Sequence, residues 1–363
     1  MEQGNQTFIA QEQAVAKREG GDRFAVVPTL AEANAELNIT DAGWVRLTAC
    51  PVCESAAIRP LATLRHMPYD RCGDCGFTFT NPQAPDPVRA AFYDSAFYTN
   101  YRHLEDLRRL DDPYFSISMY TDSRRLAQMV ADARPESVLD FGCGTGSFLA
   151  LLRDEFGVAA ADGLEISDEG RHLAKRAFGL DVAATAAELP RSNYDFALLL
   201  EVIEHVPDPN AIMAELAGLV RPGGKILITT PAVDNVLGTR LPGQCSHYTA
   251  PSHISLFTEA SMQRLLERHS LRVVKVDTDP EPGVVTAYVR SLVYSVDYLS
   301  PTAMEDDIDL LFRPTRLGRL LGRKDTRRPF GDRLLGKVLG KVDDLFGRFV
   351  SRPNHLYVLA ERI

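Results

Sequence analysis

The sequence predicts an α/β fold built around an open, mainly parallel β-sheet, and three observations support this prediction. From Ser137 onward, short apolar runs alternate with helical runs of about 10 to 15 residues, a pattern typical of βαβ units. A glycine-rich turn joins the first of these strands to the first helix. Two further strand-like runs, 271–278 and 355–362, follow with a long insertion between them. An N-terminal module with closely spaced cysteines precedes the sheet.

Composition and charge restrict the class of protein. Of the 363 residues, 45% are hydrophobic and 25% are charged, as in ordinary globular proteins. Apolar runs stay below the roughly 18 residues that a membrane-spanning helix requires, and the polar N-terminal sequence lacks a secretory apolar core. We therefore expect a cytoplasmic protein. The net charge of −9 argues against a nucleic-acid partner.

Changes in composition along the chain predict six segments. The N-terminal part is polar, with one short helix expected around Thr29 to Leu37. The predicted segments are a loosely ordered tail at 1–43, a four-cysteine module at 44–87, a helical linker or cap at 88–134, an α/β core at 135–289, a helical insertion at 290–350 and a last core strand at 351–363.

The four-cysteine module has the spacing of a metal site. Two C-x2-C pairs are separated by 18 residues, which suits two knuckles that bind tetrahedral zinc through four thiolates. Two disulfides are the alternative, and the expected reducing compartment disfavours them. A closed four-thiolate site is structural rather than catalytic. The predicted zinc ligands are Cys50, Cys53, Cys72 and Cys75.

The glycine-rich turn lies in the segment VLDFGCGTGSFL. Three glycines let the backbone turn tightly and let a ligand approach closely. Nineteen residues after the last glycine, Glu165 ends the next predicted strand, where a carboxylate can accept hydrogen bonds from two ribose hydroxyls. The combination predicts a nucleoside-binding site.

This segment resembles motif I of the class I S-adenosylmethionine methyltransferases. AELP at 187–190, YDFALLLEVIEHVPDP at 194–209 and LVRPGGKILITTP at 219–231 are similar to later motifs of that family, over roughly residues 110–290. The resemblance implies a Rossmann-like, seven-stranded sheet and S-adenosyl-L-methionine as cofactor. The cofactor-binding residues that it implies are Asp140, Gly142, Cys143, Gly144, Gly146, Glu165, Ile166, Thr185, Ala186 and Glu201.

The pair Thr185 and Ala186 departs from the usual pattern of the family. Many relatives carry an acidic residue near the adenine amino group, where this chain has Thr185 followed by Ala186. Backbone amides and the Thr185 hydroxyl are therefore expected to hold adenine. Cys143 is interpreted as a packed loop cysteine rather than a reactive thiol.

The cysteine module and the aromatic segment after it resemble the zinc-ribbon head of a bacterial methyltransferase group. This resemblance covers about residues 48–100, and the group includes sugar C-methyltransferases. It keeps a C- or N-methyltransferase of a nucleotide-linked sugar open as an alternative function.

The candidate catalytic residues follow the fourth strand of the predicted core. Glu201, Glu204 and His205 are spaced i, i+3 and i+4, and His253 lies further along in APSHISLF. One interpretation is that Glu201 contacts the cofactor region while Glu204 and His205 tie the loop together. The other is a second divalent cation at Glu201, Glu204, His205 and His253, similar to the site of small-RNA 2′-O-methyltransferases. The E-x-x-E-H part also resembles ubiquinone-pathway O-methyltransferases. Without metal, His205, His247 or His253 could act as general base.

The C-terminal insertion is basic and amphipathic. Between Arg313 and Arg352 there are 12 Lys and Arg against 4 Asp, and apolar residues recur at helical spacing from Leu334 to Phe349. Two interpretations remain open: packing over the core as a substrate lid or dimer face, and attachment to an anionic membrane surface or an acidic substrate.

We thus expect O-methylation of a small-molecule, sugar or lipid-linked acceptor. A non-catalytic adaptor on the same scaffold is a further alternative, against which the complete cofactor pattern argues.

Overall fold

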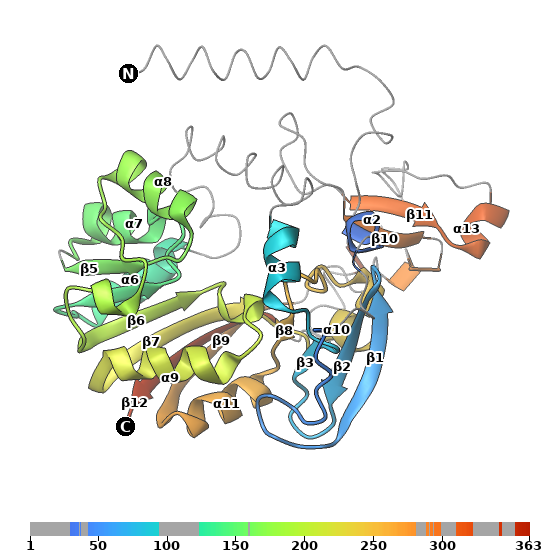
Figure 1. The fold of residues 1–363 in the computed structure, drawn as a ribbon, viewed down its shortest axis with the longest axis horizontal. Helices are drawn as coiled ribbons and strands as arrows, with labels where there is room; N and C mark the ends of the chain where they lie inside the picture. The colour runs from blue at the N-terminus through green and yellow to red at the C-terminus, as the bar shows by residue number, and fades with distance from the viewer. Residues whose placement is uncertain are drawn as a thin grey trace, which may run out of the picture.

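The structure is a computed structural model (Figure 1). It describes residues 30–35, 37, 43–93, 123–158, 160–280, 288–289, 291–292, 294–298, 310–321, 341–342 and 353–363. Parts of three predicted segments lie outside the described residues. These are most of the tail, residues 94–122 of the linker predicted at 88–134, and nearly all of the basic amphipathic segment. The short helix expected in the tail is α2 (Leu30–Ala35).

The core is a six-stranded sheet of order β5-β4-β6-β7-β12-β9. Strands β5, β4, β6 and β7 are parallel, and β12 runs antiparallel between β7 and β9, where Figure 1 shows it in dark red. The strands are β4 (Val138–Phe141), β5 (Ala161–Leu164), β6 (Tyr194–Leu200), β7 (Val220–Pro231), β9 (Leu271–Pro280) and β12 (Pro353–Arg362). This arrangement confirms the predicted Rossmann-like α/β class.

The seventh strand of the predicted sheet is reduced to a single contact in the described residues. A parallel bridge joins Leu164 of β5 to Ala183, and the amide of Glu165 also donates to the Ala183 carbonyl.

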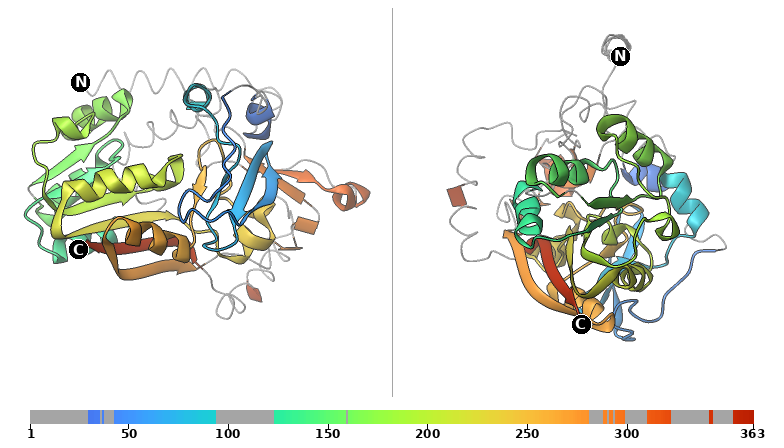
Figure 2. Two further views of the ribbon diagram at one scale, coloured as in Figure 1. Left: turned by 60° about the horizontal axis from the view of Figure 1, so that its bottom comes forward. Right: turned by 90° about the vertical axis from the view of Figure 1, so that its left-hand side faces the viewer.

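Helices cover both faces of the sheet because neighbouring strand residues point to opposite sides. Val138, Phe196 and Leu198 pack against α6 (Ser123–Asp132) and α7 (Ser147–Phe156). Leu139, Ala197 and Leu199 pack on the other side, in the cluster that contains residues of α9 (Pro209–Leu219) and α11 (Glu259–Arg268). Figure 2 shows α9 and α11 side by side. Helix α8 (Asp168–Phe178) follows β5.

The cysteine module is built into a second sheet that includes a strand from the core. Its order is β1-β2-β3-β8, and β8 (Ser255–Leu256) belongs to the segment between α10 (Val236–Arg240) and α11. The other strands are β1 (Ile58–Leu64), β2 (Met67–Cys72) and β3 (Thr78–Thr80), and α3 (Asp86–Tyr93) follows them. The rings of Phe77 and Phe257 lie 4.9 Å apart across the junction. The module therefore shares its packing with the core.

The insertion predicted as helical contains strands in its described part. Strand β10 (Tyr294–Tyr298) pairs antiparallel with β11 (Leu310–Pro314), and α13 (Arg316–Leu320) follows. Each of these strands has only five residues, so its run of residues in the sequence is too short to distinguish a strand period from a helical period. Within the described part of the chain, no helix is long and apolar enough to cross a membrane.

Candidate cofactor and acceptor sites

The glycine loop begins where β4 ends, at the carboxyl edge of the sheet. Gly142, Gly144 and Gly146 have φ of 82°, 54° and 72°, in the left-handed region that favours glycine. A Cβ on Gly142 would stand 2.6 Å from Cγ2 of Val202, whereas a Cβ on Gly144 would meet no atom within 4 Å. The loop is thus packed on one side and open on the other, as a ligand cradle requires.

Glu165 joins the end of β5 to this loop. Its Oε2 accepts from the amide of Gly144 at 2.9 Å, and its Oε1 accepts from the amide of Ser167 at 2.8 Å. Each carboxylate oxygen can accept a further hydrogen bond, so both remain suited to a ribose diol. The next residue, Ile166, is an apolar side chain with 84% exposure. The two acceptor oxygens of Glu165 and the open side of the glycine loop fit a nucleoside.

Thr185 and Ala186 lie beside this region, in the turn at 185–188. Glu188, which the sequence analysis did not single out, accepts from the Thr185 hydroxyl at 3.2 Å and from the Ala184 amide at 2.9 Å. The 3₁₀ turn Ala186–Glu188 brings this carboxylate back to the start of its own turn. Glu188 therefore fixes the conformation of the segment that carries Thr185.

Asp140 and Cys143 are held beneath the loop. Burial, with the neighbouring charge of Glu165, raises the pKa of Asp140 to about 7. Burial also raises the pKa of the Cys143 thiol well above its ordinary value. The thiolate is the nucleophilic form, so this direction disfavours a reactive Cys143. Its Sγ packs toward Gly163, where an added Cβ would stand 2.7 Å away.

The four cysteines gather as the spacing predicts. Sγ of Cys50 lies 3.7 Å from Sγ of Cys75, and Sγ of Cys53 lies 3.5 Å from Sγ of Cys72. Four sulfurs at 2.3 Å around a tetrahedral zinc ion are roughly 3.8 Å apart, so the cluster has the right size. A hydrogen bond from Cys75 lowers the pKa of Cys50 to about 5, and the same contact raises that of Cys75. Ionisation of one sulfur thus disfavours ionisation of its neighbour, and a bound cation would offset this repulsion.

We expect the purified protein to contain one zinc ion per chain, measured by elemental analysis. Cys72→Ser should lose it, because three thiolates and a hydroxyl bind zinc poorly. Cys245→Ser is the matched control, since Cys245 is buried but lies outside the cluster. Full zinc retention in Cys72→Ser would contradict a four-thiolate site.

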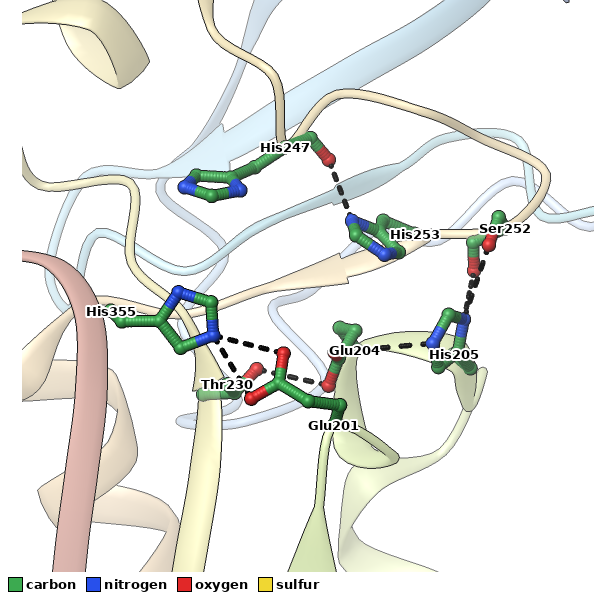
Figure 3. A network of polar contacts seen from close by, with 8 residues as sticks. All are labelled: Glu201, Glu204, His205, Thr230, His247, Ser252, His253 and His355. Atoms are coloured by element: carbon green, nitrogen blue, oxygen red, sulfur yellow. Dashed lines mark hydrogen bonds and ion pairs between the residues drawn. The ribbon is translucent and has the colours of Figure 1, made fainter. Parts of the chain in front are cut away.

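Glu201 and His355 form an ion pair at the end of β6 (Figure 3). Nε2 of His355 lies 2.9 Å from each carboxylate oxygen of Glu201. Burial would raise the pKa of Glu201, but the hydrogen bonds and charge of His355 outweigh it and lower the pKa. Glu201 has a φ of 54°, unusual for a residue with a side chain. Glu201 was predicted to contact the cofactor and to bind a cation. In the structure its carboxylate pairs with His355.

Glu204, His205 and His253 lie together just beyond the end of β6. One ligand atom from each lies within 4.8 Å of the others, and Glu201 is not part of this group. The turn Ile203–His205 positions the first two, and the segment before β8 supplies His253. Oε2 of Glu204 accepts from the Thr230 hydroxyl at 3.1 Å. Within the described residues, the buried Oε1 has no hydrogen-bond partner.

His205 and His253 both use Nδ1 in a backbone hydrogen bond, which leaves Nε2 of each ring for this group. Nδ1 of His205 lies 3.0 Å from the carbonyl oxygen of Ser252, and Nδ1 of His253 lies 3.0 Å from that of His247. A carbonyl oxygen only accepts, so in the neutral ring Nδ1 carries the proton and Nε2 keeps its lone pair. Burial lowers the pKa of both rings. Two neutral imidazoles and an orphaned carboxylate oxygen fit a divalent cation.

His247 lies outside this group. Its Nε2 lies 3.0 Å from Oδ1 of Asn354, and burial, with the charge of His355, lowers its pKa to about 4. His247 therefore supports His253 through its carbonyl. Sequence reasoning missed His355 and Asn354, which follow the insertion; their position at the start of the last predicted strand was the available signal.

Comparison with known proteins identifies the core. Residues 119–276 match the family described as a methyltransferase domain. A ubiquinone biosynthesis O-methyltransferase from Neisseria meningitidis is 33% identical over 110 residues, which are 28% of this chain and 46% of that protein. Methyltransferase GfsG from Streptomyces halstedii is 28% identical over 243 residues, 62% of this chain and 82% of that protein.

The chain spans about half the length of the Neisseria relative, 46%. A solved SAM-dependent methyltransferase from Archaeoglobus fulgidus aligns with 69% of this chain and 100% of its own, at 16% identity and a TM-score of 0.41. Three findings identify residues 119–276: the family match, the strand order of the sheet, and the glycine loop with Glu165 beside it. Residues 119–276 are therefore a class I methyltransferase domain, behind a four-cysteine module of zinc-ribbon type.

Proposed function

We propose that this protein is an S-adenosylmethionine-dependent O-methyltransferase. Its acceptor would be a hydroxyl group of a small molecule, a sugar or a lipid-linked compound, bound at a divalent cation. The observation that carries the proposal is the group formed by Glu204, His205 and His253, which follows Val202, the residue packed against Gly142. The O-methyltransferase names of several partly similar relatives support the same acceptor atom.

The cofactor would lie across the glycine loop. Gly142, Gly144 and Gly146 would line it, and Glu165 would bind its ribose hydroxyls. Bound there, S-adenosylmethionine supplies an electrophilic methyl group, so this chain has to orient the acceptor and lower the cost of losing one proton. Thr185 and Ala186 would lie at the adenine end, with Glu188 holding their turn.

The three acceptor-side residues would hold the cation through Oε1 of Glu204 and Nε2 of each histidine. A cation there would bind the acceptor hydroxyl, fix its direction and make it more acidic. Glu204 has its pKa raised by burial and by the charge of Glu201, and a cation would reverse this effect. The Glu201–His355 pair would close the site on the sheet side.

The test removes the exchangeable cation and leaves the thiolate-bound metal in place. After treatment with a mild chelator, protein with unchanged zinc content should transfer methyl groups to hydroxyl acceptors only when Mg²⁺ or Mn²⁺ is restored. Glu204→Gln keeps the hydrogen bond from Thr230 but loses the charge. We expect it to lower kcat/KM at least about 100-fold, since a catalytic cation contributes several kcal/mol.

Glu215→Gln is the matched control, because Glu215 is an exposed carboxylate on α9. Mn²⁺ binding by calorimetry gives a second readout that needs no acceptor: wild type and Glu215→Gln should bind one exchangeable ion, and Glu204→Gln should not. Full activity of the chelated wild type would contradict the cation and leave His205 or His253 as candidate base.

A further inference from the structure

The segment 245–257 carries His247 and His253, and the cysteine module holds it along its length. Thr78 and Phe79 of β3 pair with Leu256 and Ser255 of β8. The amide of Thr80 donates to the Ile254 carbonyl at 3.0 Å. Nearer the start of the segment, Nη1 of Arg65 donates to the Tyr248 carbonyl at 2.8 Å. The segment 245–257 is thus hydrogen-bonded to β3 and to the turn between β1 and β2.

Tyr69 of β2 makes the contact nearest to the proposed ligands. Its side chain is 1% exposed. Its hydroxyl accepts from the amide of Ala250 at 2.8 Å and donates to the carbonyl of His253 at 3.2 Å. The ring lies edge-on to Tyr248, with centroids 5.0 Å apart. A single hydroxyl therefore joins the two ends of the turn 250–253.

This turn sets the direction of both imidazoles. His253 is its last residue, and the carbonyl of Ser252 within it accepts from Nδ1 of His205 (Figure 3). The amide of Ile254, the next residue, donates to the Glu204 carbonyl at 2.9 Å. A change in the turn would move His253 directly and would remove the hydrogen bond that orients His205. All three members of the group depend on it.

We propose that Tyr69 is a positioning residue for the acceptor site, through which the cysteine module sets the geometry of His205 and His253. The inference rests on the proposed function, because it assigns this group to a cation and an acceptor. It gives the module a role in the reaction. Tyr69 acts through the backbone of the turn 250–253, at the Ala250 amide and the His253 carbonyl.

Loss of the hydroxyl would leave the Ala250 amide and the His253 carbonyl without this partner in a buried place. Buried donors and acceptors seek other partners, so the turn would rearrange rather than stay in its present form. The ring of Tyr69 would still fill its volume, and the zinc cluster and glycine loop would be untouched. The effect should therefore be confined to the acceptor side.

The experiment compares Tyr69→Phe with Tyr194→Phe in the full chain. Tyr194 is equally buried, and its hydroxyl donates to Asp162 in the core, away from the segment 245–257. Three quantities are measured: the Kd for Mn²⁺, the Kd for S-adenosylhomocysteine, and hydrogen–deuterium exchange of peptides covering 245–257. Zinc content and binding of S-adenosylhomocysteine report that both parts remain folded.

We expect Tyr69→Phe to weaken Mn²⁺ binding about tenfold and to speed exchange in 245–257, with binding of S-adenosylhomocysteine unchanged. Tyr194→Phe should change neither property of the acceptor side. Unchanged Mn²⁺ affinity and unchanged exchange in Tyr69→Phe would overturn the inference. If wild type binds no Mn²⁺, the proposed cation is wrong, and the exchange of 245–257 alone decides whether Tyr69 holds the segment. If Tyr69→Phe does not fold, Tyr69 is a general stability residue and the inference fails.

Discussion

Replacement of Glu165 by alanine is expected to weaken binding of S-adenosylhomocysteine at least about 100-fold. The carboxylate would make two charge-assisted hydrogen bonds to the ribose, each contributing about 1.5–3 kcal/mol, and it also fixes the loop through the amides of Gly144 and Ser167. The variant loses both contributions at once. Calorimetric titration of purified wild type and variant measures the change.

Glu169→Ala serves as the control for this measurement. Glu169 lies in the first turn of α8, four residues from Glu165, and its side chain is exposed. It should bind S-adenosylhomocysteine as wild type does. Equal binding by Glu165→Ala would place the nucleoside elsewhere, and absence of binding by folded wild type would favour the adaptor hypothesis.

Gly142→Ala is expected to lower the free energy of unfolding by about 2–5 kcal/mol. About 1–2 kcal/mol would come from placing a Cβ at a φ of 82°. About 1–3 kcal/mol would come from the clash of this Cβ with Cγ2 of Val202, 2.6 Å away. Because Val202 follows Glu201, the shift should also disturb the end of β6 and weaken binding of S-adenosylhomocysteine. Urea unfolding in buffer containing zinc measures the stability change.

Two variants separate the two causes. Gly157→Ala has a similar φ of 69° but would meet no atom within 4 Å, so it should lose only the conformational part. The double variant Gly142→Ala, Val202→Ala removes the clashing methyl groups and should recover part of the loss relative to Val202→Ala alone. Equal effects of Gly142→Ala and Gly157→Ala would mean that the loop yields without cost.

The sheet and the cofactor loop were predictable because their signals are local. The strand ending in Asp140, the glycines after it and Glu165 at the end of the next strand lie within 30 residues, and parallel strands bring such ends to one edge. The cysteine spacing was equally informative, since thiolate geometry around zinc admits few arrangements. In these parts, residue type and spacing determine the chemistry.

The acceptor side depends on contacts between distant segments. Glu201 has the spacing of a ligand, yet it pairs with His355, which lies 154 positions away and arrives with β12. Glu188 holds the turn of Thr185, and Tyr69 reaches His253 only because β8 joins the second sheet. Periodicity along one segment contains no information on such pairings, because they are fixed by strand order and side-chain packing.

The central place of β12 has a consequence for how the protein forms. In the described part of the central sheet, β9 pairs only with β12, and β12 separates it from β7. Neither β7 nor β9 can therefore complete its pairing before residues 353–362 are synthesised. Until then β7 and β9 each present an open edge, a template for pairing with other chains. Such long-range pairing folds slowly. The same residues deliver His355 to Glu201, so this pair at the end of β6 forms only after the last strand has joined the sheet.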